Sequence, residues 1–234
     1  MTQQRTTRAA RPRAATLERR KEILQAALEL FGAKGFYNGS LAEIAEVVGM
    51  THAGILHHFG SKNQLLLEVL AYRDQADVEH LENRRMPHGL GLFRHLVHTA
   101  FTNATRPGIV QAYAVLSVEA VTDDHPAKDY FVGRYQILRD EVAAAFAVVC
   151  ADYHLDPADE RVRDAAAGIL AVMDGLQIQW LLDPQHVNLA RASQFALEAM
   201  VSAMVDPRPS PLYSDGTPPP TATVPLSHPH LENP

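Results

Sequence analysis

Side chains that could contact a nucleic acid are concentrated between residues 40 and 62. Hydroxyl, imidazole and ammonium groups, which can hydrogen-bond to phosphates and base edges, occur there among very small residues. Small residues let a helix approach base edges closely, and an alanine methyl can touch a thymine methyl. We expect the following residues of this stretch to contact DNA: Ser40, Thr51, His52, Ala53, Gly54, His57, His58 and Lys62.

A helix over residues 52–59 would carry the base-reading side chains on one side. Residues advance about 100° each along an α-helix, so Ile55 and Phe59 point inward while Ala53 and His57 fall on the opposite side. This arrangement suits a helix that enters a DNA groove. The alternative is a surface helix with two solvated histidines.

Three residues near the ends of this helix are placed for phosphate groups. Thr51 precedes it, His58 lies on its flank, and Lys62 stands at the start of the next helix. Free backbone N–H groups at a helix start favour anions, so Lys62 and its neighbours could hold a phosphate together.

Helix-start and helix-stop signals surround the same stretch. Ser40 and Glu43 can form a reciprocal cap, and Ser61 can do the same with the glutamine three residues later. Gly49 can adopt the left-handed conformation that ends a short helix, and Thr51 can cap the next one. The order is helix, tight turn, helix, which presents its second helix to the major groove of DNA.

The run from Thr16 to Leu70 resembles the DNA-binding domain of the TetR family of transcriptional repressors. Two positions depart from that family: Leu56 stands where many members have tyrosine, and His58 where they have another aromatic hydroxyl. The matching residues are Phe31, Gly35, Ile44, Ala45, Gly49, Ile55, His57, Phe59, Ser61, Lys62 and Leu65. The family's DNA-contact roles are carried over to three residues only: Thr51, His57 and Lys62.

Charge is divided unevenly along the 234 residues. The formal net charge is −6, yet residues 1–62 hold nine Lys/Arg against five Asp/Glu, which leaves +4 there and −10 on the rest. A basic module on an acidic body suits DNA binding, because the local field matters more than the total charge.

The composition favours a cytoplasmic protein of ordinary globular type. Apolar residues make up 47% of the chain, no window approaches eighteen uninterrupted apolar residues, and no hydrophobic signal core follows the first arginines. A single cysteine, Cys150, cannot form an internal disulfide. We therefore expect no membrane span and no export.

Helical periodicity persists to about Val205 without strand signals, so the predicted fold is all-α. We expect a disordered basic arm at 1–15, a three-helix helix-turn-helix domain at 16–62, a helical effector-binding and dimerisation domain at 63–205, and a disordered proline-rich tail at 206–234. The expected helices are 17–34, the short pair described above, 61–83, 92–105, 108–121, 127–154, 157–182 and 187–205. The helix from Ser61 would link the two domains as a lever.

A stripe of small residues marks a candidate dimer interface. Gly168, Ala171 and Gly175 recur three and four apart, and a glycine inside a helix costs about 1 kcal/mol relative to alanine. Close approach by another helix would explain them, and with the last helix it could form a two-fold four-helix interface. The TetR resemblance implies the same arrangement. The alternative is tight packing within one subunit.

The middle helices are the expected site of a small-molecule effector, because they set polar groups among apolar ones. The candidate ligand-binding residues are His95, His98, Tyr113, Glu119, Tyr130, Tyr135, Gln177 and Trp180. His95 and His98 share a helical face, but a metal site needs at least a third ligand and no HExxH pattern is present. We expect no metal and no cofactor.

The sequence is interpreted as a homodimeric, ligand-responsive repressor that binds a roughly palindromic DNA operator and releases it when a small molecule binds. The same DNA-binding module in an activator, or in a regulator without a ligand, is an open alternative. A helical metal-dependent hydrolase is remote, because GxSxG, HExxH and phosphate-loop patterns are all missing. The chain is therefore not expected to be an enzyme.

Overall fold

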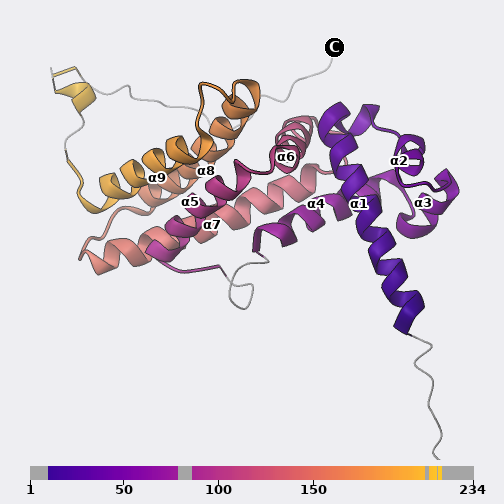
Figure 1. The fold of residues 1–234 in the computed structure, drawn as a ribbon. Helices are drawn as coiled ribbons and strands as arrows, with labels where there is room; N and C mark the ends of the chain where they lie inside the picture. Colours follow the sequence, from indigo (N-terminus) through magenta and orange to yellow (C-terminus); the bar gives the residue numbers. More distant parts are fainter. Residues whose placement is uncertain (1–9, 79–85, 209–210, 215, 218–234) are drawn as a thin grey trace, which may run out of the picture.

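The computed structural model describes residues 10–78, 86–208, 211–214 and 216–217. Within those ranges the chain forms nine α-helices, one short 3₁₀ helix and no strand, which confirms the all-α prediction. The N-terminal helices gather at one end of the molecule, and the helices that follow form a body at the other (Figure 1).

The N-terminal module consists of α1 (Ala10–Asn38), α2 (Leu41–Val47) and α3 (His52–Phe59). Their apolar sides meet in one core, in which Phe31, Ile44 and Ile55 are completely buried. The third helix has the predicted bounds. Gly49 connects α2 to α3 with a φ of +64°, the left-handed conformation expected from the sequence.

Both short helices begin at the predicted caps. The Glu43 N–H donates to Ser40 Oγ over 3.1 Å, and the Ser40 N–H donates to the Glu43 carboxylate over 3.1 Å. Hydrogen bonds from Lys34 and Ser40 lower the pKa of Glu43 to about 2. At α3 the Gly54 N–H donates to Thr51 Oγ1 over 3.1 Å. Orphan N–H groups at both helix starts are thereby satisfied.

The first helix is longer than predicted at both ends. It begins at Ala10, not at residue 17, so the expected disordered arm is wrong for residues 10–15; residues 1–9 lie outside the described ranges. Alanine and arginine are good helix formers, and Pro12 falls in the first turn, where its missing N–H is tolerated. At the other end, Gly35 has non-helical φ and ψ and interrupts the helix where the sequence predicted its end, and a further turn continues to Asn38.

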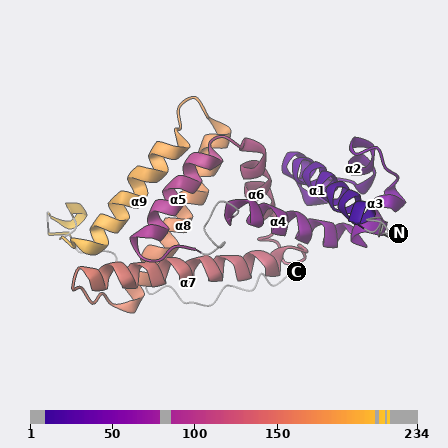
Figure 2. The same ribbon diagram turned by 60° about the horizontal axis from the view of Figure 1, so that its bottom comes forward.

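Six further helices form the lever and the body, and Figure 2 shows α5, α8 and α9 side by side above α7. Their starts and ends differ by a few residues from the predicted ranges, and the predicted stretch 79–83 lies outside the described residues. They are α4 (Lys62–Val78), α5 (Leu90–Asn103), α6 (Pro107–Glu119), α7 (Lys128–Asp152), α8 (Asp159–Leu182) and α9 (Leu189–Val205).

The body meets the N-terminal module along α1 and α6. A side chain at Gly32 would touch the backbone of Ala112 at 3.0 Å, so the two helices approach closely there. Further along, the Phe36 N–H donates to the Glu119 carboxylate over 2.8 Å. The core of the module continues into α6 and the start of α7. The helices of the N-terminal module therefore do not form an independent core.

Helix α8 and the tail each bear on a prediction. The helical segment Glu160–Leu182 is long and apolar enough for a membrane span, but length and composition alone are weak grounds because core helices share both. In the tail, a short 3₁₀ helix, η2, occupies Pro211–Tyr213, and the expected disorder of the tail stays a prediction. The predicted tail residues from 218 onward lie outside the described ranges.

The kink at Gly35 generates a stability prediction. Gly35 has φ +77° and ψ 171°, a region almost restricted to glycine, and an added Cβ would overlap Glu119 Oε1. Gly49 also has a positive φ but open space around its Cβ position. We expect Gly35→Ala to lower the free energy of unfolding by about 2–4 kcal/mol and Gly49→Ala by about 1 kcal/mol.

Urea denaturation of both variants would measure the difference. Because both substitutions remove a positive-φ glycine, Gly49→Ala is the matched control for backbone strain. Equal losses in the two variants would contradict a tight junction between α1 and Glu119.

Candidate functional site

The recognition helix α3 presents its predicted outer side to solvent. His52, Ala53 and His57 are exposed, whereas Ile55 and Phe59 are buried against the module's core. Gly54 is half-buried, and its N–H donates to the hydroxyl of the exposed Thr51. The exposed face thus combines an imidazole with two very small residues, as base-edge contact requires.

Arg20 holds the C-terminal end of α3 in place. Its guanidinium donates to the His58 carbonyl oxygen and pairs with Glu68 on α4. The same group lies 4.3 Å from the centre of the Phe59 ring, in a cation–π contact. One side chain of α1 therefore fixes the orientation of α3 relative to α4. Sequence reasoning assigned no role to Arg20.

Two candidate DNA contacts, Ser40 and Lys62, also have partners within the chain. Ser40 caps α2, as described above. Lys62 Nζ lies 4.4 Å from the centre of the Phe36 ring and donates to the Tyr37 carbonyl oxygen over 3.3 Å. Burial lowers the pKa of Lys62. Lys62 therefore anchors the start of α4 to the end of α1.

His58 is half-buried beside other cations. Its ring centre lies 5.9 Å from that of His57. Burial, followed by the charges of His57 and Arg20, lowers the pKa of His58 below its ordinary value of 6.5. The imidazole of His58 is therefore mainly neutral at pH 7 in the free protein.

A cavity of about 610 Å³ lies within the body, bordered by α4, α5, α6, α7 and α8. Such a volume is typical of sites for drug-sized molecules. Five of the predicted ligand-binding residues line it: His95, Tyr113, Tyr130, Tyr135 and Gln177. The structure thus brings together side chains from four helices that are distant in sequence.

The other three candidates are not among the lining residues of this cavity. His98 is exposed on α5, and Trp180 is half-buried in the last turns of α8. Glu119 sits at the junction with α1, where it accepts from the Phe36 N–H. Placing these three in the ligand site was therefore wrong for this cavity, because a polar residue in a helical stripe can serve a junction or the surface instead.

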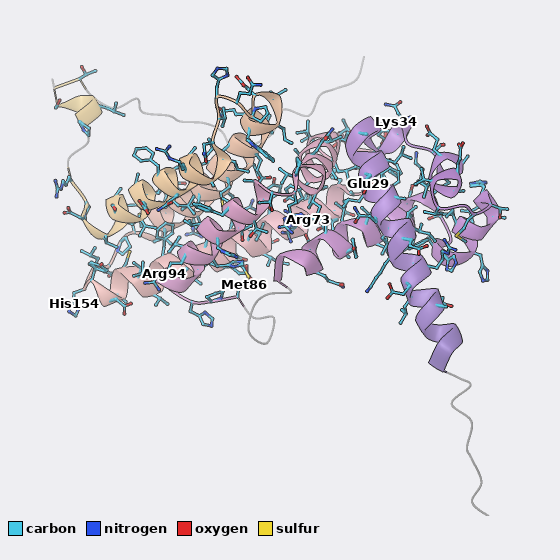
Figure 3. The ribbon with its side chains drawn as sticks, in the orientation of Figure 1. Glu29, Lys34, Arg73, Met86, Arg94 and His154 are labelled. Carbon is cyan, nitrogen blue, oxygen red and sulfur yellow. The ribbon has the colours of Figure 1, made fainter. Side chains whose placement is uncertain are left out.

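An ion-pair network that sequence reasoning missed occupies one end of the cavity. Asp74 on α4 pairs with Arg134 over 2.8 Å and with Arg73 over 3.2 Å, and it accepts from the Tyr130 hydroxyl. The Arg73 guanidinium stacks 4.2 Å from the centre of the Tyr113 ring. Figure 3 shows Arg73 where α4 meets the body. Ion pairs in this network join α4 directly to α7.

A second polar contact extends the network toward α8. The Tyr135 hydroxyl donates to Asp174 Oδ2 over 2.6 Å. Burial raises the pKa of both groups. Arg73 follows Val69 and Leu70 at helical spacing, so it occupies a position of the apolar stripe. A charged residue at such a position could have predicted a buried polar network from the sequence.

The small-residue stripe on α8 does not form one surface. A side chain at Gly168 would meet Met200 of α9 at 2.7 Å, so this glycine serves packing within the subunit, as the alternative reading held. Ala171 is exposed and Gly175 has open space around it. The place of Gly168 in a dimer interface therefore stays a prediction, beside its observed packing against α9.

Large apolar side chains nevertheless remain exposed on these helices. Leu182 on α8 and Phe195 on α9 are 82% and 75% exposed, and Ile178 is partly exposed. No group of three His, Cys, Asp or Glu side chains that could hold a metal ion occurs within the described ranges.

Comparison with protein families gives two adjacent matches. Residues 23–69 match the family described as "Bacterial regulatory proteins, tetR family", and residues 92–206 match "BetI-type transcriptional repressor, C-terminal". The first match covers the helix-turn-helix, and the second covers α5 to α9.

Individual proteins agree with this assignment. The chain is 30% identical to the transcriptional regulator BetI of Agrobacterium fabrum over 74% of this chain and 82% of BetI. A triclosan complex of SmeT, the repressor of a multidrug efflux pump in Stenotrophomonas maltophilia, has the same fold with a TM-score of 0.65 at 18% identity, covering 80% of this chain and 91% of SmeT.

A transcriptional regulator from Saccharomonospora viridis in complex with choline shares the fold as well. Its TM-score is 0.63 at 21% identity, and the match covers 78% of this chain and 95% of that one. From the family matches and the BetI relative, the chain belongs to the TetR family: it is a helix-turn-helix DNA-binding protein that regulates transcription, and not an enzyme.

Proposed function

We propose that this protein is a homodimeric cytoplasmic repressor that releases a palindromic DNA operator when a small molecule fills the cavity between α4 and α8. The observation that carries the proposal is that α4 contacts the N-terminal module at one end and lines the cavity at the other. Near its C-terminal end, Arg73 and Asp74 line the cavity, and at its start Lys62 contacts the end of α1. A ligand in the body can therefore act on the DNA-binding module through one helix.

The network around Asp74 makes α4 sensitive to the cavity's contents. Arg134 and Tyr130 reach Asp74 from α7, so the position of α4 depends on polar contacts that also face the cavity. A ligand that rearranges these contacts would favour another position of α4. Such differential binding to two states is what an allosteric effector requires.

Named ligands of structural neighbours support a small-molecule effector. SmeT has been solved with triclosan and the Saccharomonospora viridis regulator with choline. These two ligands differ in charge and size, so they support a ligand in the body without specifying its chemistry for this chain.

Exposed apolar groups on α8 and α9 support the homodimer. Phe195 and Leu182 are too large and too exposed for an ordinary solvated surface, and only 28% of the apolar window in α8 is buried within one subunit. Pairing α8 and α9 with their copies would cover them as a four-helix interface. A two-fold dimer would place its recognition helices about 34 to 36 Å apart, on successive major-groove faces.

The recognition helix generates the first DNA prediction. A preferred duplex selected from random sequences with the full-length protein should be an approximate palindrome. We expect His57→Ala to weaken binding to that duplex by roughly 5–100-fold and nonspecific binding much less, because a lost base contact is worth about 1–3 kcal/mol. Fluorescence anisotropy at fixed salt would measure both affinities.

His98→Ala is the matched control, since His98 is also exposed but lies on the body. Absence of any preferred duplex in the selection would refute operator binding. An equal loss of specific and nonspecific affinity in His57→Ala would make His57 a backbone contact.

A second prediction concerns pH. If a phosphate lies near His58, DNA favours the protonated imidazole, so the pKa of His58 rises on binding. Since burial lowers that pKa below 6.5 in the free protein, DNA affinity should increase as pH falls through the pKa of the complex and level off only below the pKa of the free protein. Measuring Kd from about pH 8 to 5.5 tests this, because His58→Gln should flatten the profile. A wild-type profile unchanged by that substitution would remove His58 from the phosphate contacts.

The exposed face of α9 generates a third prediction. Phe195→Glu would place two carboxylates in the proposed two-fold interface, and we expect it to weaken self-association by at least about 30-fold. Sedimentation velocity would measure the change. Val121→Glu is the control, because Val121 is equally exposed but lies outside α8 and α9. A wild-type protein that sediments as a monomer at micromolar concentration would refute the dimer.

A further inference from the structure

Three of the buried polar atoms of cavity-lining residues have no hydrogen-bond partner within the described part of the chain. They are Asn103 Nδ2 and Thr99 Oγ1 on α5 and Arg134 Nε on α7. Asn103 is 1% exposed, so bulk solvent does not reach its amide freely. Leaving a buried donor unsatisfied costs about as much as a lost hydrogen bond. These atoms therefore favour a ligand that offers acceptors.

The orientation of the Asn103 amide is fixed by a neighbour. Arg106 donates to Asn103 Oδ1 through Nε over 3.0 Å and through Nη2 over 2.8 Å. Because the oxygen faces these two donors, the Nδ2 group must be the end without a partner. Thr99 stands four residues earlier on the same face of α5, so both groups can face one ligand atom or two adjacent ones.

Two of the acidic groups that line the cavity, by contrast, already receive hydrogen bonds. Asp74 accepts from Arg134 and from the Tyr130 hydroxyl, and Asp174 accepts from Tyr135. A ligand that offered only donors would have to displace these contacts. An acceptor can bind beside α5 without breaking them.

Charges of both signs line the same space. A cationic ligand would approach Arg73 and Arg134, whereas an anionic one would approach the four lining carboxyl groups, which belong to Asp74, Asp129, Glu141 and Asp174. Either charge would also lose its hydration on entering a largely apolar cavity. An uncharged acceptor avoids both penalties.

We infer that the effector is an uncharged molecule with an apolar body and a carbonyl-type oxygen, such as a ketone, ester, lactone or amide, which accepts hydrogen bonds from Asn103 and Thr99. This inference rests on the proposed role of the cavity as the effector site. It makes Asn103 and Thr99 the specificity-determining residues, with Arg134 Nε available to a second acceptor.

A matched series of probes tests the preferred charge. Benzylacetone, hydrocinnamate and phenethyltrimethylammonium share one apolar skeleton and end in a ketone, a carboxylate and a quaternary ammonium. We expect the full-length protein, titrated calorimetrically without DNA, to bind the ketone at least about tenfold more tightly than either ion. An ammonium that binds as tightly as the ketone, or no saturable binding of the ketone at millimolar concentration, overturns the inference.

Asn103→Asp tests the donor directly. The aspartate keeps an oxygen for Arg106 but replaces the Nδ2 donor with a second acceptor. We expect ketone affinity to fall by roughly 3–10-fold or more while affinity for the ammonium probe rises. Unchanged affinities for both probes would exclude Asn103 from the site.

Thr99→Val separates a ligand contact from a structural role. Valine has the same shape but lacks the unpartnered hydroxyl, so we expect ketone affinity to fall by roughly 2–10-fold while the melting temperature of the ligand-free protein stays the same or rises. A lower melting temperature would show that the hydroxyl stabilises the fold. Thr105→Val is the control, since the Thr105 hydroxyl donates to the Thr102 carbonyl oxygen and does not line the cavity.

A DNA-release assay distinguishes the proposed regulatory function from the inferred preference of the cavity for an uncharged acceptor. Tight ketone binding without release of the selected duplex would refute the effector response and leave the cavity's preference intact. Release by the ammonium probe alone would support the regulatory proposal and refute the preference for an uncharged acceptor.

Discussion

The apolar core that joins the DNA-binding helices to α6 constrains the whole molecule. Phe31 of α1 and Leu116 of α6 are fully buried in the same cluster, which also includes the first turns of α7. Burial of each such side chain contributes about 1.5–3 kcal/mol, so separating the module from the body would expose much of its core. The module can tilt with α6 but cannot move independently of it.

Polar contacts at the edges of this core specify its geometry. Glu119 accepts from the Phe36 N–H beside the kink at Gly35, and Arg20 ties the end of α3 to α4. Apolar packing tolerates small rotations, whereas a hydrogen bond to a backbone N–H has a narrow range of distance and angle. The apolar core therefore supplies most of the stability, and these contacts define the angle at which α3 leaves the protein.

Local signals in the sequence were sufficient for the elements but not for their long-range contacts. The cap at Thr51, the turn at Gly49 and the bounds of α3 depend on neighbours within a few residues, so they could be predicted. The pairing of Asp74 with Arg134 joins residues sixty positions apart, and nothing local indicates it. Gly168 shows the same limit, because its spacing predicts close packing but cannot tell which helix packs there.

Ligand response in this architecture requires that the cavity differ between two positions of α4. A molecule that fits both equally shifts nothing, however tightly it binds, and a shift from 1:99 to 99:1 needs about 5.5 kcal/mol of preference. The unpartnered groups on α5 could donate hydrogen bonds to a ligand in either position of α4, because α5 lies within the body. The network at Asp74 differs between the two positions of α4. Asp74 pairs with Arg73 on its own helix and with Arg134 and Tyr130 on α7, and the contacts with α7 must break if α4 moves. If the protein works as proposed, affinity and response therefore depend on different walls of one cavity: the α5 side selects the ligand, and the α4 side converts its presence into a movement of the recognition helix.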